Sequence, residues 1–340
     1  MDQSPIKQGK SNVFNAARLS VAPMMDWTDR HCRYLHRLMS RRALLYTEMV
    51  TAPALVQGGA LHLLRFNEAE HPVALQLGGS DPQELALAAK MAADEGYDEV
   101  NLNVGCPSDR VQSGCFGAVL MERPQLVADC VAAMQDKCDV EVTVKCRIGV
   151  DDQIPEDVLP DFLQKVSAKG VNRFAIHARK AWLQGLSPKE NRDIPPLNYD
   201  LVLQMKKDFS HLHISVNGGI DSLDQAESFL AQGLDGVMIG RAAYHTPSAI
   251  LLEADRRIFG DSRQTTPEAV VYAMLPYIEQ HLSEGGKLHQ ITRHMLGLFA
   301  GQSGARAWRR HLSENAHRAD AGPEVVEAAL GHVTFAKAVQ

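Results

Sequence analysis

The sequence has few of the features that mark metal-binding, disulfide-rich or membrane proteins. Its six cysteines form no C-x-x-C pair and none follows Cys146, which argues against a zinc cluster and a distributed disulfide framework. No stretch approaches the roughly 18 uninterrupted apolar residues that a membrane span needs, and residues 1–11 are polar, without a signal-peptide core. We therefore expect a cytoplasmic protein with reduced thiols, no metal site and no membrane contact.

Net charge is small, but it is unevenly distributed. The chain has 35 Lys and Arg against 41 Asp and Glu, a net charge of −6 that taken alone argues against a nucleic-acid partner. Between Lys287 and Arg318, however, the sequence has six basic residues and a single acidic one, Glu314, so this segment has a charge of +5. The segment is either a solvated helix surface or a contact for an anionic polymer.

Short apolar runs rich in β-branched residues recur through the first 245 residues and alternate with helical patterns. The eight runs span residues 19–24, 43–50, 72–77, 99–104, 140–148, 172–177, 214–217 and 236–239. Eight such units match the size of a TIM barrel, an α/β fold whose strands are buried on both faces. A doubly wound open sheet is the alternative, but the turn at Pro23-Met24-Met25-Asp26 lacks the G-x-G-x-x-G fingerprint.

The strand pattern stops after Tyr244 and helical patterns continue to the end of the chain. Thr266-Pro267 opens one such helix and Gly285-Gly286 ends it. We therefore expect a flexible lead at residues 1–18, a barrel domain at 19–245 and a C-terminal helical bundle domain at 246–340. The basic segment belongs to the helical domain.

Catalytic residues of a TIM barrel lie at the carboxyl ends of its strands, so residues just after each run are candidates. They are Pro23, Met24, Met25, Glu48, Gln76, Asn101, Asn103, Cys106, Lys145, Arg147, His177, Arg179, Asn217, Gly218, Gly219, Gly240 and Arg241. Glycines after the last two strands would let the backbone approach a phosphate, although paired glycines also make ordinary turns. Together the polar set suits a flavin with donors along its pyrimidine edge.

Single side chains within this set leave alternatives open. Lys145 and His177 could face the developing negative charge of a bound ring, or each could satisfy a neighbouring carboxylate, and Lys145 could form a Schiff base. Cys106 lies in a loop shaped by Gly105 and Pro107. A free thiol is mostly protonated at neutral pH, so Cys106 could act as a general acid, or as a nucleophile if His177 served as its base.

Eight motifs, in this order, resemble those of the tRNA-dihydrouridine synthases. They are Val21 to Met24, Tyr46 to Met49, Gln76 to Gly79, Asn101 to Ser108, Lys145 to Gly149, Ile176 to Arg179, Asn217 to Ile220 and Asp235 to Arg241. The resemblance runs from about Leu19 to His317. Two further motifs, Ile291 to Leu296 and Gly304 to Arg310, resemble the branch that acts on uridines 20 and 20a of the D-loop.

The resemblance implies an FMN-dependent TIM barrel that uses NADPH to reduce the uracil C5–C6 double bond. It implies that reduced FMN gives hydride from N5 to C6 and that Cys106 protonates C5. The residues implied to hold FMN are Pro23, Met24, Met25, Gln76, Lys145, His177, Asn217, Gly218, Gly219, Gly240 and Arg241. Those implied to contact or orient tRNA are Asn103, Glu190, Arg306 and Arg309.

An RNA partner also has a physical rationale. A stacked uracil cannot be reduced in place, so it must be extruded at a cost of a few kcal/mol that phosphate contacts can offset. We expect a monomer that binds tRNA and not DNA. Three other functions remain open: a flavin enzyme acting on a small pyrimidine, a flavin-free barrel using Lys145 as a Schiff base, and an RNA-binding protein without catalysis.

Overall fold

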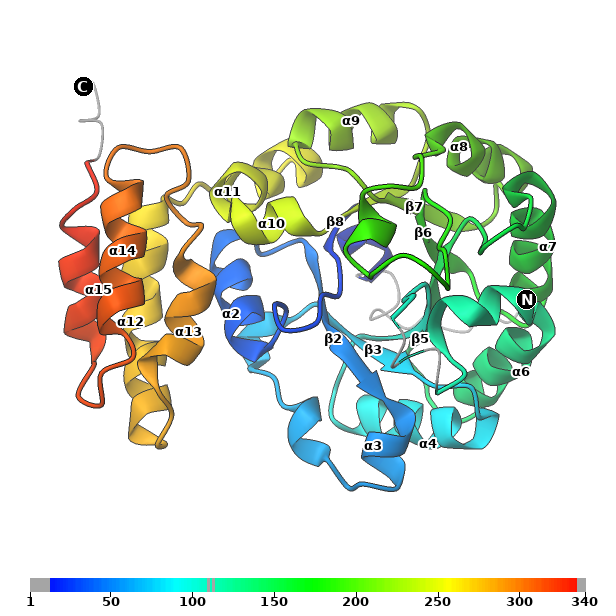
Figure 1. Ribbon diagram of the computed structural model, residues 1–340, viewed down its shortest axis with the longest axis horizontal. Coiled ribbons are helices and arrows are strands. Elements are labelled where there is room, and N and C mark those ends of the chain that lie inside the picture. Colours follow the sequence, from blue (N-terminus) through cyan, green and yellow to red (C-terminus); the bar gives the residue numbers. More distant parts are fainter. Residues whose placement is uncertain (1–12, 109–110, 112–113, 335–340) are drawn as a thin grey trace, which may run out of the picture.

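Eight parallel strands form a closed barrel in the computed structural model, which describes residues 13–108, 111 and 114–334 (Figure 1). Each strand pairs with the next, and β8 returns to pair with β1. The strands are β1 (Leu19–Val21), β2 (Leu44–Thr51), β3 (Val73–Gly78), β4 (Glu99–Val104), β5 (Glu141–Arg147), β6 (Arg173–His177), β7 (His213–Asn217) and β8 (Gly236–Ile239). The predicted barrel is thus confirmed, and the open sheet is wrong.

The strands are buried on both faces, but the two faces differ in chemistry. All six residues of β4 are buried, yet Glu99, Asn101 and Asn103 alternate with Val100 and the other apolar residues of the strand. Successive side chains of a strand point to opposite faces, so the apolar set packs under the helices while the polar set points into the barrel. The polar inner side of β4 places hydrogen-bonding groups inside the barrel, directly below the strand ends.

Helices surround the barrel between the strands. They are α2 (Arg30–Met39), α3 (Ala52–Val56), α4 (Pro82–Asp94), α6 (Pro124–Gln135), α7 (Pro155–Ser167), α8 (Tyr199–Asp208), α9 (Leu223–Ala231), α10 (Arg241–His245) and α11 (Pro247–Phe259), with 3-10 turns η1 (Leu61–Leu64), η2 (Glu68–Glu70), η3 (Gly117–Glu122) and η4 (Glu190–Arg192). Side chains of Asp29, Asp81, Asn198 and Ser222 cap four of them by accepting backbone N–H bonds. Every described helix is too short or too polar to cross a bilayer.

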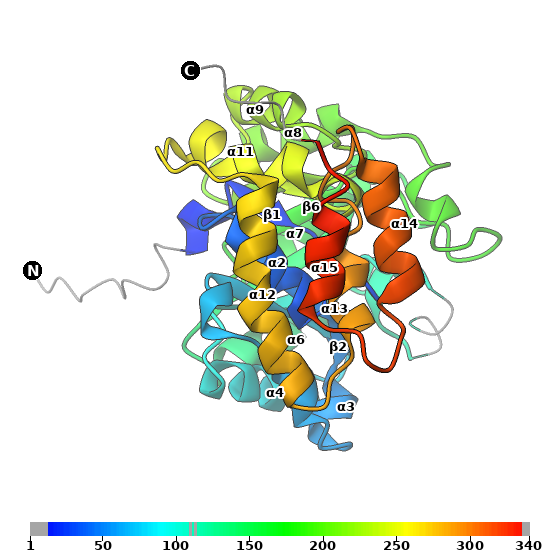
Figure 2. The same ribbon diagram turned by 90° about the vertical axis from the view of Figure 1, so that its left-hand side faces the viewer.

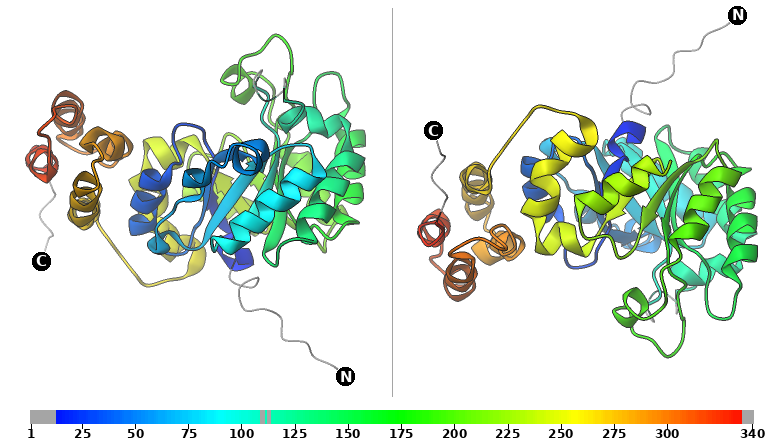
Figure 3. Two further views of the ribbon diagram at one scale, coloured as in Figure 1. Left: turned by 90° about the horizontal axis from the view of Figure 1, so that it is seen from below. Right: turned by 90° about the horizontal axis from the view of Figure 1, so that it is seen from above.

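Four helices follow as a separate group beside the barrel (Figures 1 and 2). They are α12 (Pro267–Ser283), α13 (Leu288–Met295), α14 (Ala305–Asn315) and α15 (Pro323–Leu330). We expected the helical unit to begin at residue 246, but α11 packs on α2 and α9 of the barrel. A linker at residues 260–266 then leads to α12 (Figure 3). Residues 335–340 lie outside the described part.

The amino-terminal end of the barrel is closed by the residues that precede β1. Residues 1–12 of the expected lead lie outside the described part, whereas Val13 and Ala17 are buried against inward-facing barrel residues such as Leu44. The ring of Phe14 contacts His213 at the start of β7. The opposite, carboxyl end of the strands therefore remains the accessible one.

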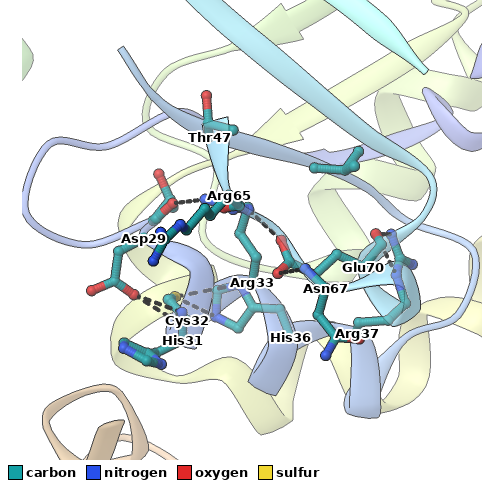
Figure 4. Close-up of polar contacts among 12 residues, drawn as sticks. Asp29, His31, Cys32, Arg33, His36, Arg37, Thr47, Arg65, Asn67 and Glu70 are labelled. Carbon is teal, nitrogen blue, oxygen red and sulfur yellow. Dashed lines mark hydrogen bonds and ion pairs between the residues drawn. The ribbon is translucent and has the colours of Figure 1, made fainter. Parts of the chain in front are cut away.

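The helical unit is fastened to the barrel at the start of α2. Asp29 accepts hydrogen bonds from the backbone N–H groups of His31 and Cys32 through Oδ1 (Figure 4). Its Oδ2 accepts from Arg293 Nη2 at 2.6 Å and contacts His294 Nε2 at 3.0 Å, both on α13. Burial opposes the charge of Asp29, but these partners still hold its pKa well below the usual value. Arg293, part of the basic segment, is therefore engaged between the two units.

Candidate active site at the carboxyl end of the barrel

The strand-end residues predicted to form a site do converge. Asn103 is the register partner of Lys145 across β4 and β5, and Arg147 is the partner of His177 across β5 and β6. His177 in turn pairs with Asn217, which pairs with Met238 just before the β8 loop. Neighbouring parallel strands thus bring these side chains to one edge of the barrel.

Two carboxamides lie side by side at the centre of this edge. Asn103 Nδ2 donates to Gln76 Oε1 at 2.8 Å, and both side chains are buried. Asn103 Oδ1 accepts from the backbone N–H groups of Gly105 at 3.1 Å and Cys106 at 3.0 Å. The side chain that was predicted to contact tRNA therefore also shapes the loop that carries the thiol.

The Cys106 loop is held from three directions. Besides Asn103, Arg147 Nε donates to the Gly105 carbonyl at 3.1 Å, and the N–H of Ala118 donates to the Cys106 carbonyl at 2.9 Å. Cys106 is half-buried, and its thiol donates to Ser108 Oγ at 3.5 Å. Among the described residues no hydrogen bond joins this thiol to His177, so the geometry gives no support to a histidine base for Cys106.

The site is strongly cationic. Burial and the nearby Arg147 lower the pKa of Lys145 to about 8. Burial also lowers the pKa of Arg147 to about 10, and Arg192 and Arg179 add to this shift. At the rim, Arg241 pairs with Asp193 at 2.8 Å, and the pair is half exposed. Several cations with few acids beside them favour an anionic ligand.

His177 lies next to the glycine loop after β7. Burial, reinforced by Arg147 and Lys145, lowers the pKa of His177 well below its usual value, so its ring is neutral at pH 7. Its Nε2 atom is buried without a hydrogen-bond partner in the described part of the chain. Gly218 has φ +107°, and a Cβ there would lie 2.5 Å from His177 Cδ2. Glycine at this position therefore leaves room for the ring and leaves its free nitrogen available to a ligand.

The loops after β1 and β8 form the adjoining wall. The N–H of Ala22 donates to the Ile239 carbonyl at 2.8 Å, which joins the two loops just before Pro23. Met24 approaches Gly240 closely, with its sulfur 3.6 Å from the position of a Cβ built there. Met24 is partly buried against the core, whereas Met25 is 56% exposed. Only the first methionine therefore contributes to packing in this structure.

The residues expected to orient tRNA are spread over distant elements. Glu190 begins η4 in the long loop after β6, where its exposed carboxylate accepts from the N–H and hydroxyl of Ser187. Arg306 and Arg309 are exposed on α14, and Figure 1 shows α13 between that helix and the barrel. These arginines therefore lie away from the site that contains Asn103.

Sequence reasoning missed a basic cavity between the barrel and the helical unit. It has a volume of about 460 Å³ and is lined by Arg30, Arg65, His281, Glu284, Gly285, Gly286, Lys287, His289 and Gln290. Arg30 and Arg65 belong to the barrel and Lys287 to the helical unit, so their charges are combined only by the tertiary fold. No group of three His, Cys, Asp or Glu side chains that could hold a metal ion occurs in the described ranges.

A closed barrel that gathers a thiol, two carboxamides and several cations at the carboxyl ends of its strands defines a (β/α)8-barrel enzyme. Within that class, the chain belongs to the dihydrouridine synthase family, because the family model described as Dihydrouridine synthase (Dus) matches residues 20–334. The resemblance read from the motifs is thereby confirmed.

Curated relatives match nearly the whole chain. The tRNA-dihydrouridine(20/20a) synthase of Vibrio vulnificus is 60% identical over 94% of this chain and 98% of its own length. The enzyme of the same name from Escherichia coli K12 is also 60% identical, over 97% of this chain and 95% of its own length. An old yellow enzyme homologue from Zymomonas mobilis has a TM-score of 0.53 at 14% identity, covering 74% of this chain and 92% of that chain. At that identity the likeness supports the fold alone.

Proposed function

We propose that this protein uses FMN and NADPH to reduce uridines 20 and 20a of the tRNA D-loop to 5,6-dihydrouridine. The observation that carries the proposal is the Cys106 thiol, whose loop is held by Asn103 and Arg147 beside the buried cations Lys145 and Arg147. Relatives about 60% identical over nearly their full length are named tRNA-dihydrouridine(20/20a) synthase, which supports the choice of uridines.

The side chains at this end of the barrel suit a planar heteroaromatic ring that carries a phosphate. The unpartnered Nε2 of His177 and the neighbouring cations Lys145 and Arg147 support a polar, anionic ligand at this position. The residues that would hold FMN are Pro23, Met24, Met25, Gln76, Lys145, His177, Asn217, Gly218, Gly219, Gly240 and Arg241. When bound, FMN would supply hydride to uracil C6.

Cys106 would supply the proton that balances this hydride at uracil C5. The thiol is half-buried, and its loop is held by four hydrogen bonds, so it can be presented to a ring without being freely solvated. A general acid fixed in this way contributes about 10²- to 10⁴-fold in rate. Ser108 Oγ, 3.5 Å from the sulfur, keeps the thiol oriented before the substrate binds.

Binding of tRNA would depend on cations from both units. Extruding a base costs a few kcal/mol, which phosphate contacts can offset. Arg306 and Arg309 are exposed on α14, and Arg30, Arg65 and Lys287 line the cavity between barrel and helical unit. Arg293 is excluded from this set because its guanidinium is paired with Asp29.

An anaerobic turnover experiment tests the proposal. The purified protein is reduced with NADPH, and flavin absorbance is followed after addition of unmodified tRNA, orotate or free uridine. We expect rapid return of the oxidised spectrum with tRNA alone, and dihydrouridine at positions 20 and 20a of the product. Reoxidation by a small pyrimidine only, or a protein that binds no flavin, would refute the proposal.

A further inference from the structure

A chain of buried hydrogen bonds runs inside the barrel from its interior to the candidate site. Thr143 Oγ1 donates to Glu99 Oε1 at 2.6 Å, and Asn101 Nδ2 donates to Thr143 Oγ1 at 2.8 Å. Gln76 Nε2 donates to Asn101 Oδ1 at 2.8 Å, and Gln76 Oε1 accepts from Asn103 Nδ2 at 2.8 Å. Each of these five side chains is at most 8% exposed, so water does not compete with the chain.

The group at the start of this series of hydrogen bonds, Glu99, determines which atom donates and which accepts in each bond. The Glu99 carboxylate forms an ion pair with the Arg173 guanidinium, and it also accepts from the Tyr46 hydroxyl at 2.8 Å. An ionised carboxylate can only accept, so the Thr143 hydroxyl must donate to it and must accept from the Asn101 amide nitrogen. Asn101 then presents its oxygen to the amide nitrogen of Gln76. Gln76 in turn presents its Oε1 to Asn103, so Asn103 must turn its Nδ2 toward Gln76.

The hydrogen bonds that Asn103 already makes determine which kind of ligand atom it can still bind. One N–H of its Nδ2 is used by Gln76, and its Oδ1 accepts two backbone N–H bonds, from Gly105 and Cys106. A carboxamide has two N–H donors and two lone pairs, so Asn103 retains one donor and no acceptor for a ligand. Any atom bound there must be an acceptor such as a ring carbonyl oxygen.

We propose that Glu99, Thr143 and Asn101 form a positioning relay that fixes the orientation of the Gln76 and Asn103 amides and, through Asn103, the Cys106 loop. None of the three need touch the ligand, so they are positioning residues. The part of this inference that concerns a bound ring rests on the proposed FMN-dependent function, whereas the part that concerns the Cys106 loop does not.

Substitution of Thr143 by Val tests the relay, because Val has nearly the same shape but neither donates nor accepts. We expect T143V to weaken FMN binding by about tenfold, as for loss of one buried hydrogen bond. We also expect a changed visible spectrum of the bound flavin and a changed rate of Cys106 alkylation by iodoacetamide, followed by peptide mass. T143S keeps the hydroxyl and should restore all three.

Two further variants separate the relay from general destabilisation. Val142 precedes Thr143 and packs in the apolar cluster, so V142A should lower stability but leave FMN affinity and Cys106 alkylation unchanged. N101A breaks the same chain, so the double variant T143V/N101A should bind FMN no more weakly than N101A alone. Unchanged alkylation and affinity in T143V, equal losses in V142A, or additive losses in the double variant would each overturn the relay. Wild-type protein that binds no FMN would refute the proposed function, and alkylation of Cys106 would still test the relay.

Discussion

The attachment of the helical unit through Asp29 gives a prediction whose size can be worked out. Replacing Asp29 with Ala removes the cap of α2, which is worth about 1 kcal/mol. It also removes the ion pair with Arg293, which is 45% exposed and so contributes at most about 1 kcal/mol. It leaves the fully buried His294 ring without its acceptor, at about 1–3 kcal/mol. We therefore expect D29A to lower the free energy of unfolding by about 2–5 kcal/mol.

Asp81 provides a matched control, because it caps α4 through the N–H of Glu84 and has no ion pair among the described residues. D81A should cost only about 1 kcal/mol in the same urea titration, followed by tryptophan fluorescence. D29N retains the cap and should lose only the interdomain part. The difference between D29A and wild type should shrink as pH falls below 3.8, because a carboxylate with a lowered pKa stabilises only while it is ionised. If D29A costs no more than D81A, the interdomain contacts contribute nothing and the reasoning is wrong.

Three further predictions concern the site. C106A should lower turnover on tRNA by about 100-fold or more while flavin reduction by NADPH stays unchanged, and full turnover would contradict the general-acid role. Since the pKa of Lys145 is about 8, FMN affinity should fall as pH rises from 7 to 9, and K145M should abolish that dependence. The free protein should also gain stability between pH 8 and 10.5, because the unfolded chain then binds more protons, and K145M should lose this gain in urea titrations across that range. G218A should lose FMN because its Cβ would meet His177. The control G233A, at φ +100° with open space around it, should cost about 1 kcal/mol of stability and keep FMN. Equal FMN affinity in the two variants would exclude the steric explanation.

The local pattern of the chain was sufficient for the fold. The eight apolar runs matched the eight strands within about three residues at each end, because a strand buried on both faces leaves a continuous apolar signal. The boundary between the barrel and the helical unit was harder to predict, because it depends on where α11 belongs. Its periodicity resembles that of the following helices, and only its packing on α2 and α9 assigns it to the barrel.

For the site, the sequence alone determined which side chains meet, because residues at the ends of successive parallel strands must lie at one edge of a barrel. It also determined the family, through motifs in a fixed order. Only the tertiary structure decided how those side chains are used. The pairing of Arg293 with Asp29 joins residues 264 positions apart, and the relay from Glu99 to Gln76 crosses three strands. Which group pairs with a given charge or amide depends on distances between strands. These distances are fixed only when the barrel closes, so no local sequence pattern contains them.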